Sequence, residues 1–229
     1  MKVTSLAAAL IAVAVGMVGV CDLSNAATLA SWTFEPPFAD LTNSATIGSI
    51  NPAVGTGTAS GVHASADTDW STPSGNGSTD SMSSNTWAIN DYLQFTTSTG
   101  GNSNITFSWD QTSSGTGPKD FSLSYSTDGS TFTPVTTYAV LANASPNPVW
   151  NSATASPLYS YSAGVTGISA SSIYFRLTNT TTVSANGGTV AAGGTSRVDN
   201  VAIAGVPEPS TLALGGIALV AALASRRRA

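Results

Sequence analysis

Short segments in which apolar and polar residues alternate run through the middle of the chain. Gly, Pro, Asn or Ser bounds each segment. A period of two is typical of a β-strand with one buried face. The pattern predicts strands at 30–34, 92–97, 105–110, 121–126, 173–178 and 201–203, and no comparable helical stripe lies between them.

Turn residues connect these predicted strands. Asp128-Gly129 indicates a hairpin that joins 121–126 to a strand at 131–135, because a tight turn needs residues that tolerate positive φ. Two regions, 42–84 and 142–156, are predicted to be loops. The first is long for a structureless loop, so short edge strands are expected within it, for example around Val62.

Many short strands, hairpin turns and no crossover helix favour an all-β fold. We expect an antiparallel, jelly-roll-like β-sandwich over residues 27–205. An N-terminal signal-peptide helix and a C-terminal hydrophobic helix flank this predicted body.

The first 26 residues have the pattern of a secretory signal peptide. Lys2 precedes an apolar run at 6–20, and the small residues Ser24 and Ala26 follow it. Cleavage after Ala26 is therefore expected, which makes the Sec translocon and signal peptidase predicted partners. A retained membrane anchor is the alternative interpretation of residues 1–26.

The only cysteine, Cys21, lies inside this predicted signal peptide. Val20 stands where a lipoprotein signal needs a small residue, so lipidation of Cys21 is not expected. The exported chain would contain no thiol and no disulfide, although export permits them. Its stability would then depend on an ordinary hydrophobic core.

The predicted body is strongly acidic. The whole chain has 12 acidic and 7 basic residues. Two of these acids, Asp22 and Glu208, and four of the bases, Lys2 and the arginines at 226–228, lie in the two terminal segments. The body therefore holds ten acids and three bases, with no basic patch. This balance argues against nucleic acid and anionic lipid as partners of the body.

The last 24 residues, 206–229, combine three parts. Pro207, Glu208 and Pro209 form a rigid, extended strip, because proline fixes φ. An uncharged apolar run at 211–224 follows, which would span roughly 21 Å as a helix against a hydrocarbon core of about 30 Å. The chain then carries the basic residues Arg226, Arg227 and Arg228, which should remain on the cytoplasmic side of a membrane. The alternative is a buried C-terminal helix of a soluble domain.

This order of parts resembles the PEP-CTERM sorting signal of gram-negative bacteria. The resemblance implies recognition by an exosortase, a membrane-embedded transpeptidase-like enzyme, and removal of the tail after transient anchoring in the inner membrane. Segments 29–35, 91–135 and 193–205 are also similar to domains that precede such tails. Those domains resemble jelly-roll sandwiches of the galactose-binding or lectin-like kind.

Candidate chemistry in the body is sparse, and no catalytic residue is predicted. The one histidine, His63, lies in a Gly/Ser-rich stretch and is expected to be an inert surface residue. No G-x-S-x-G motif accompanies it, and too few ligands exist for zinc. Asp67 and Asp69 are candidates for a structural calcium site, with a solvated acidic turn as the alternative.

Three of the five tryptophans occur outside the clearest strands. Trp70, Trp87 and Trp150 fall in predicted loops or at strand ends, whereas Trp32 and Trp109 are expected in the core. Trp70 and Trp150 are the candidate glycan contacts, because an exposed ring can stack on a sugar. Anchoring of a loop is the competing role.

These observations favour a non-enzymatic, exported β-sandwich protein that an exosortase sorts to the cell surface or extracellular matrix. Association with exopolysaccharide or a biofilm matrix is expected. A lectin-like carbohydrate-binding module that uses loop aromatics is the alternative. An enzyme acting on polysaccharide is the third hypothesis, because Glu35, Asp110 and Asp120 stand near predicted strand ends.

Overall fold

The computed structural model describes residues 26–206. The helices predicted for the signal peptide and for the C-terminal tail fall in residues 1–25 and 207–229, outside the described residues. One compact unit spans Ala27–Gly205.

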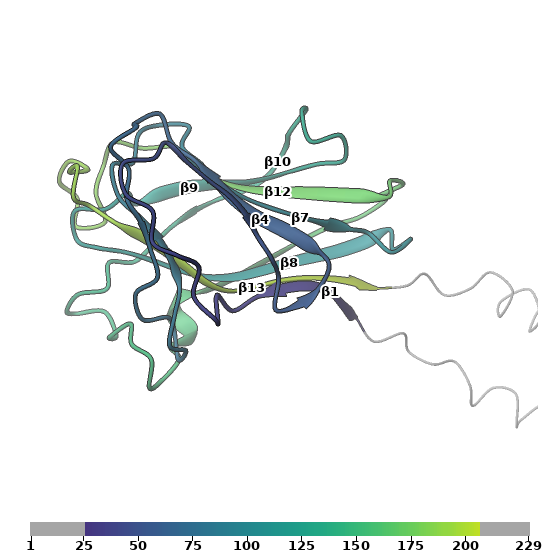
Figure 1. Cartoon of the computed structure of the whole chain (residues 1–229), viewed down its shortest axis with the longest axis horizontal. Helices are drawn as coiled ribbons and strands as arrows, with labels where there is room; N and C mark the ends of the chain where they lie inside the picture. Colours follow the sequence, from purple (N-terminus) through teal and green to yellow (C-terminus); the bar gives the residue numbers. More distant parts are fainter. Residues whose placement is uncertain (1–25, 207–229) are drawn as a thin grey trace, which may run out of the picture. The chain divides into compact units, whose positions relative to one another are not determined.

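Two antiparallel sheets make up this unit (Figure 1). The first sheet has the central order β11-β8-β13-β1-β3, and the short strands β6 and β5 continue from β13. Its strands are β1 (Ala27–Trp32), β3 (Val54–Gly55), β5 (Trp70–Ser71), β6 (Met82–Ser84), β8 (Asn104–Ser113), β11 (Ser160–Val165) and β13 (Ser196–Val206).

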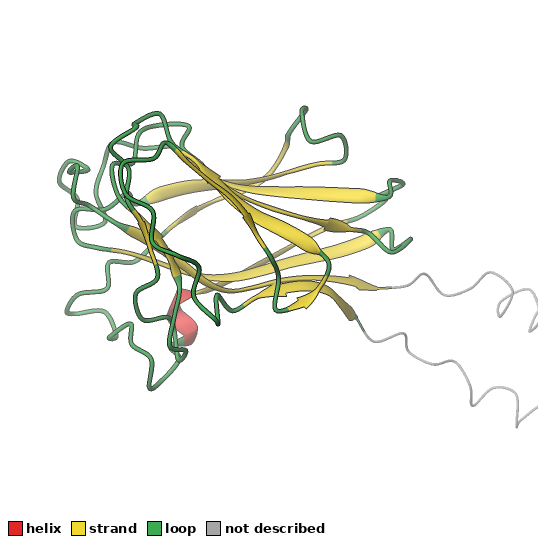
Figure 2. Ribbon diagram, in the orientation of Figure 1, coloured by secondary structure: helices red, strands yellow, loops and turns green. Residues whose placement is uncertain are grey.

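The second sheet has the order β10-β9-β12-β7-β4-β2. Its strands are β2 (Thr46–Ile50), β4 (Gly57–Val62), β7 (Tyr92–Ser98), β9 (Asp120–Ser126), β10 (Thr133–Ala139) and β12 (Ser172–Asn179). A single turn of 3-10 helix, η2 (Pro157–Tyr159), precedes β11, and loops make up most of the remaining residues (Figure 2).

The chain passes repeatedly between the two layers. Strand β7 belongs to the second sheet, β8 to the first and β9 to the second again, and β10 to β13 alternate in the same way. The predicted class is therefore confirmed: the described residues form an all-β, antiparallel, two-sheet sandwich.

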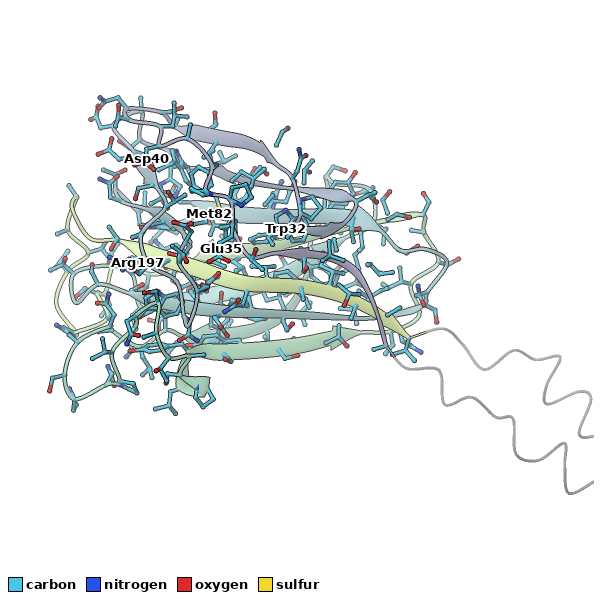
Figure 3. The ribbon with its side chains drawn as sticks, turned by 60° about the horizontal axis from the view of Figure 1, so that its bottom comes forward. Trp32, Glu35, Asp40, Met82 and Arg197 are labelled. Carbon is cyan, nitrogen blue, oxygen red and sulfur yellow. The ribbon has the colours of Figure 1, made fainter. Side chains whose placement is uncertain are left out.

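The core lies between the sheets and is rich in aromatic rings. Phe107 of β8 stacks on Phe175 of β12, with ring centroids 4.7 Å apart. Trp32 of β1, labelled in Figure 3, meets Phe95 of β7 edge to face at 5.4 Å. Burial of each such side chain contributes about 1.5–3 kcal/mol. Trp32 and Trp109 are both buried, which confirms their predicted place in the core.

The region 42–84, predicted to be mostly loop, contains five strands. One of them, β4, ends at Val62, so a strand there is confirmed, but it pairs with both β7 and β2 and is therefore not the edge strand that was expected. The second sheet also extends beyond it to β2. Small residues fill the inward positions of β4: Ala59 is fully buried, and the Trp70 ring covers Gly61 so closely that a Cβ would lie 2.3 Å from it.

The predicted hairpin around Asp128-Gly129 joins β9 to β10. Gly129 has φ of 75°, whereas Asp128 is not in the left-handed region. Asp128 instead accepts hydrogen bonds from the backbone N–H groups of Ser130 and Thr131, each at 2.8 Å. The connection is thus longer than a two-residue turn, and β10 begins at Thr133.

Candidate functional site

The residues that the sequence singles out for sorting lie outside the described part of the chain. These are Pro207, Glu208, Pro209, Arg226, Arg227 and Arg228. The last described residue, Val206, ends β13 and directly precedes the predicted motif. Among residues 26–206, no helix is long and apolar enough to cross a bilayer.

His63 is a buried residue, which corrects the expectation of a surface histidine. It follows β4 directly and is 3% exposed. The rings of Trp70 and Trp87 lie 4.8 Å and 4.3 Å from its imidazole. Trp70 belongs to β5 and Trp87 to the loop before β7, and together these two rings help to exclude water from His63.

A serine and an aspartate face the two nitrogens of this imidazole. Ser84 Oγ lies 3.4 Å from Nε2, and Asp91 Oδ2 lies 3.5 Å from Nδ1. Thr68 Oγ1 lies 3.2 Å from Nδ1. Burial lowers the pKa of His63 to about 4, so its ring is neutral at pH 7. Burial also raises the pKa of Asp91.

The order serine, histidine, aspartate matches that of hydrolase triads, but the setting differs. A nucleophile must meet its substrate, and Ser84 is only 2% exposed. The oxygens of Asp91 already accept backbone hydrogen bonds from Ala64 at 2.7 Å and from Ala88 at 2.6 Å. The group therefore ties the ends of β4, β6 and β7 together.

A second buried polar network contains Asp110 of β8 and Asp199 of β13. Asn76 and Asn200 donate their side-chain N–H groups to Asp110 Oδ2, each at 2.9 Å. Asp199 Oδ2 accepts from the backbone N–H of Asn76 at 2.8 Å and from the Ser78 hydroxyl. These contacts hold the loop between β5 and β6 against the first sheet.

Burial is the largest cause that raises the pKa of Asp199 to about 6, and the charge of Asp110 adds to it. Asp199 thus acts as a hydrogen-bond acceptor within the fold. It does not pair with Arg197, since no lysine or arginine among the described residues forms a salt bridge. Arg197, labelled in Figure 3, is partly buried, and its Nε has no hydrogen-bond partner among those residues.

The two calcium candidates, Asp67 and Asp69, differ in exposure and in hydrogen bonding. Asp67 is exposed, whereas Asp69 accepts from the Asn43 backbone at 3.1 Å and from Asn85 Nδ2 at 3.3 Å. Within residues 26–206, no group of three or more His, Cys, Asp or Glu side chains could hold a metal ion. Asp69 thus serves as a link between two loops in this structure.

The loop tryptophans point inward, which corrects the expected glycan contacts. Trp70 is fully buried and Trp150 is 5% exposed. Their indole N–H groups donate to the backbone oxygens of Ser44 at 2.9 Å and of Ser74 at 2.7 Å. Trp87 is 6% exposed and donates likewise to Ser84. All three rings anchor loops, and none presents a face to a sugar.

One surface hollow, of about 570 Å³, lies beside the edge strand β2. Phe34, Phe38 and Leu41 line it from one side, and Ile47 and Ile50 from the other. Glu35, labelled in Figure 3, is one of the residues that line this hollow. Its Oε1 accepts a hydrogen bond from the backbone N–H of Asp80 at 3.3 Å. Glu35 thereby links the loop after β1 to the loop before β6.

The outer face of the second sheet carries a different arrangement, which the sequence analysis missed. Arg176 of β12 lies between two aromatic rings, with its guanidinium carbon 4.0 Å from the Tyr92 centroid and 3.8 Å from that of Phe132. Its Nε donates to Gln94 Oε1 at 2.8 Å. We call these four residues, Tyr92, Gln94, Phe132 and Arg176, the Arg176 clamp.

A protein-family model described as the PEP-CTERM protein-sorting motif matches residues 205–228. The chain therefore carries a PEP-CTERM sorting motif at its C-terminal end, as its three-part tail predicts. No curated protein is similar enough to the whole chain to count as a match.

Several solved structures are similar to this chain at a low level. The CBM22-1-GH10 modules of Clostridium thermocellum endo-1,4-β-D-xylanase 10B, complexed with xylohexaose, are 17% identical over 77% of this chain and 28% of that one, with a TM-score of 0.43. The carbohydrate-binding module CBM6cm-2 of Cellvibrio mixtus lichenase 5A, in complex with cellotriose, is 14% identical over 77% and 97%, with a TM-score of 0.36.

The K3 cleaved adhesin domain of Lys-gingipain from Porphyromonas gingivalis W83 is 15% identical over 77% of this chain and 99% of that domain, with a TM-score of 0.38. The chain thus spans about a quarter of the xylanase structure and nearly all of the two single domains. All three TM-scores lie below 0.5, so these similarities carry no conclusion about the function or the ligand of this chain.

Proposed function

We propose that this protein is an exosortase substrate whose β-sandwich body acts, without enzymatic activity, at the cell surface or in the surrounding exopolysaccharide. The observation that carries the proposal is the PEP-CTERM motif at residues 205–228, which begins where β13 of the body ends. This motif implies an exported protein that an exosortase sorts to the cell surface.

The three parts of the tail have separate physical roles. The prolines at 207 and 209 keep Glu208 extended, so that an enzyme can grip the backbone around it. The apolar run holds this strip near the membrane surface, and it is short enough to serve as a transient anchor in the inner membrane. The arginines fix its orientation, because moving a charge to the bilayer centre costs about 2.5–3.5 kcal/mol.

Two features of the body support a non-enzymatic role. Its Ser84, His63 and Asp91 group is enclosed, and its Asp110 and Asp199 side chains are occupied by hydrogen bonds within the fold. A body of this kind would act through its surface, by binding to the matrix or by forming part of it. Association with exopolysaccharide and a biofilm is therefore the proposed setting.

The test is the processing of the variant Glu208→Ala in a host that carries an exosortase. The prolines, the apolar run and the arginines remain, so the variant should insert normally and then accumulate in the inner membrane with its tail attached. Cell fractionation with detection of the C-terminal peptide measures this. Asp67→Ala, which removes an exposed carboxylate from the body, is the matched control and should be processed like wild type.

The arginine cluster gives a second, distinguishable result. Replacement of Arg226, Arg227 and Arg228 by Ser removes the charges that hold the end of the tail on the cytoplasmic side. The altered tail should therefore be translocated across the membrane without cleavage, and the protein should not accumulate in the membrane. If Glu208→Ala is processed and exported like wild type, the tail is not recognised through its PEP motif and the sorting proposal is wrong.

A further inference from the structure

The guanidinium of Arg176 is held in one orientation by the Arg176 clamp. The rings of Tyr92 and Phe132 lie 4.0 Å and 3.8 Å from its central carbon. Gln94 Oε1 accepts its Nε–H at 2.8 Å. Strand β12 places Arg176 directly opposite Gln94 of β7 and Ser124 of β9. The position of the charged group is therefore fixed before any ligand arrives.

The outer edge of this guanidinium has no partner. No hydrogen bond among residues 26–206 uses either Nη atom of Arg176, and no carboxylate there forms a salt bridge with its guanidinium. An arginine side chain normally satisfies this edge by bidentate hydrogen bonds to a carboxylate or phosphate. None of the three bases of the body pairs with a carboxylate among residues 26–206, so Arg176 is distinguished by the fixed orientation of its guanidinium. The open edge of this fixed group can bind a carboxylate that comes from outside the fold.

The sheet around Arg176 is polar and uncharged. The positions beside it on the neighbouring strands, and the next outward positions on β12, carry hydroxyl, amide or phenol groups. The half-buried ones are Tyr92, Gln94, Thr96, Ser122, Tyr174 and Thr178, whereas Ser124 and Ser126 are buried. Such groups exchange hydrogen bonds with sugar hydroxyls, and none of them repels an anion.

We propose that the Arg176 clamp binds the carboxylate of a uronic-acid unit in an anionic polysaccharide, whose neighbouring hydroxyl groups lie on the polar sheet around it. The proposal rests on the proposed function, because export to exopolysaccharide brings the body into contact with such a chain. An anionic membrane surface would instead need a cluster of basic residues, and the Arg176 clamp contains a single basic residue.

The direct test measures binding of polygalacturonate to the full-length chain, purified in detergent, by isothermal titration calorimetry. The comparison polymer is polygalacturonate whose carboxylates have been reduced to alcohols. Wild type should bind the acidic polymer and bind the reduced one at least tenfold more weakly. Added NaCl should weaken binding to the acidic polymer, because salt screens an exposed charge contact.

Variants then assign the binding to the clamp. A hydrogen bond to a charged group is worth about 1.5–3 kcal/mol, so Arg176→Gln should weaken binding by about tenfold or more. Lys119→Gln removes the same charge from another part of the body and should change affinity by less than about twofold. Gln94→Glu places a carboxylate beside Arg176 Nε, and this internal partner should also weaken binding.

Thermal unfolding separates loss of the site from loss of the fold. Gln94→Glu keeps the side-chain size and the two rings, so it tests the site even if Arg176→Gln unfolds. The proposal is overturned if wild type does not bind polygalacturonate, if it binds the reduced polymer equally, or if Gln94→Glu binds as wild type does. Binding to phosphatidylglycerol vesicles in place of the polymer would also contradict it. Each of these results leaves the processing of the tail unaffected, since the assay uses the purified chain.

Discussion

At the scale of single residues, burial moves the pKa values of His63 and Asp199 in opposite directions. The pKa of His63 falls from 6.5 to about 4, and that of Asp199 rises from 3.8 to about 6. Between pH 4 and 6.5 the unfolded chain binds a proton at His63 and the folded chain does not, so acidification destabilises the fold. Between pH 3.8 and 6 the folded chain binds one at Asp199, so acidification stabilises it.

Each effect amounts to about 3 kcal/mol over its full range. The two therefore nearly cancel between pH 4 and 6, and Asp91, whose pKa burial also raises, acts on the same side as Asp199. The combined effect of His63 and Asp199 should accordingly change the melting temperature of the wild-type protein little across this interval. The balance depends on both buried networks being intact.

The variant Asp199→Asn tests whether the pH effects of His63 and Asp199 on stability offset each other, because an amide does not titrate. Its melting temperature should fall more steeply than that of wild type as the pH is lowered from 6 to 4, when His63 is no longer offset. The variant should also be less stable at every pH, since an amide N–H would face the donors Asn76 N–H and Ser78 O–H. Thermal unfolding at closely spaced pH values measures both effects.

The matched control is Asp67→Asn, which changes an exposed carboxylate and should follow the wild-type pH profile. Parallel profiles for wild type and Asp199→Asn would show that Asp199 does not retain its proton in the folded chain at pH 4–6.

At the scale of elements, the pairing of β1 with the short strand β3 depends on one glycine. Gly55 has φ of 79°, and a Cβ built on it would lie 1.9 Å from the backbone oxygen of Leu29. No side chain fits there unless the two strands separate. The first sheet therefore continues to β3 only because residue 55 has no Cβ.

Gly55→Ala should destabilise the protein by more than Gly101→Ala, and urea unfolding compares the two. Gly101 has φ of 80° but nothing within 4 Å of its Cβ position, so its substitution carries only the left-handed backbone cost of about 1–2 kcal/mol. Gly55→Ala adds the backbone clash to the same cost. Equal losses in the two variants would show that β1 and β3 separate without penalty.

Large alternating side chains made much of the fold predictable from the sequence. Strands β7, β8, β9 and β12 carry residues such as Leu93, Phe107 and Phe175 at every second position, and the structure contains these strands. Strands β2 to β6 and β11 were not predicted as defined strands. Strands β3 and β5 are only two residues long and β6 only three, and small residues occupy the inward positions of β4. Ala59 and Gly61 are buried by what packs on them, which the local sequence does not reveal.

The candidate sites likewise were predictable only where their residues are contiguous in the sequence. The sorting motif is contiguous and could be found by inspection, whereas His63, Ser84 and Asp91 meet only after three strands have come together. The Arg176 clamp likewise joins residues of β7 and β12 to Phe132, which lies just before β10. For Trp70 and Trp150 the sequence allowed both glycan contact and loop anchoring, and the structure shows anchoring, because both rings are buried and their N–H groups bond to loop backbone.

At the scale of the whole molecule, the two ends of the body lie on neighbouring strands. Ala27, the predicted first residue after signal-peptide cleavage, pairs with Gly205 near the end of β13. Strand β13 is complete at Val206, immediately before Pro207. Removal of residues beyond β13 therefore leaves every strand of the described sandwich in place, so processing and a folded body are compatible.

The central claim is that the tail is a sorting signal that is removed, and the intact mass of the native protein tests it most directly. The protein should be isolated from cells and from the medium of a host with an active exosortase, and its two ends assigned by mass spectrometry. We expect the surface or released form to begin at Ala27 and to lack the C-terminal peptide with Arg226, Arg227 and Arg228. Recovery of that form with its arginines still attached would contradict the account.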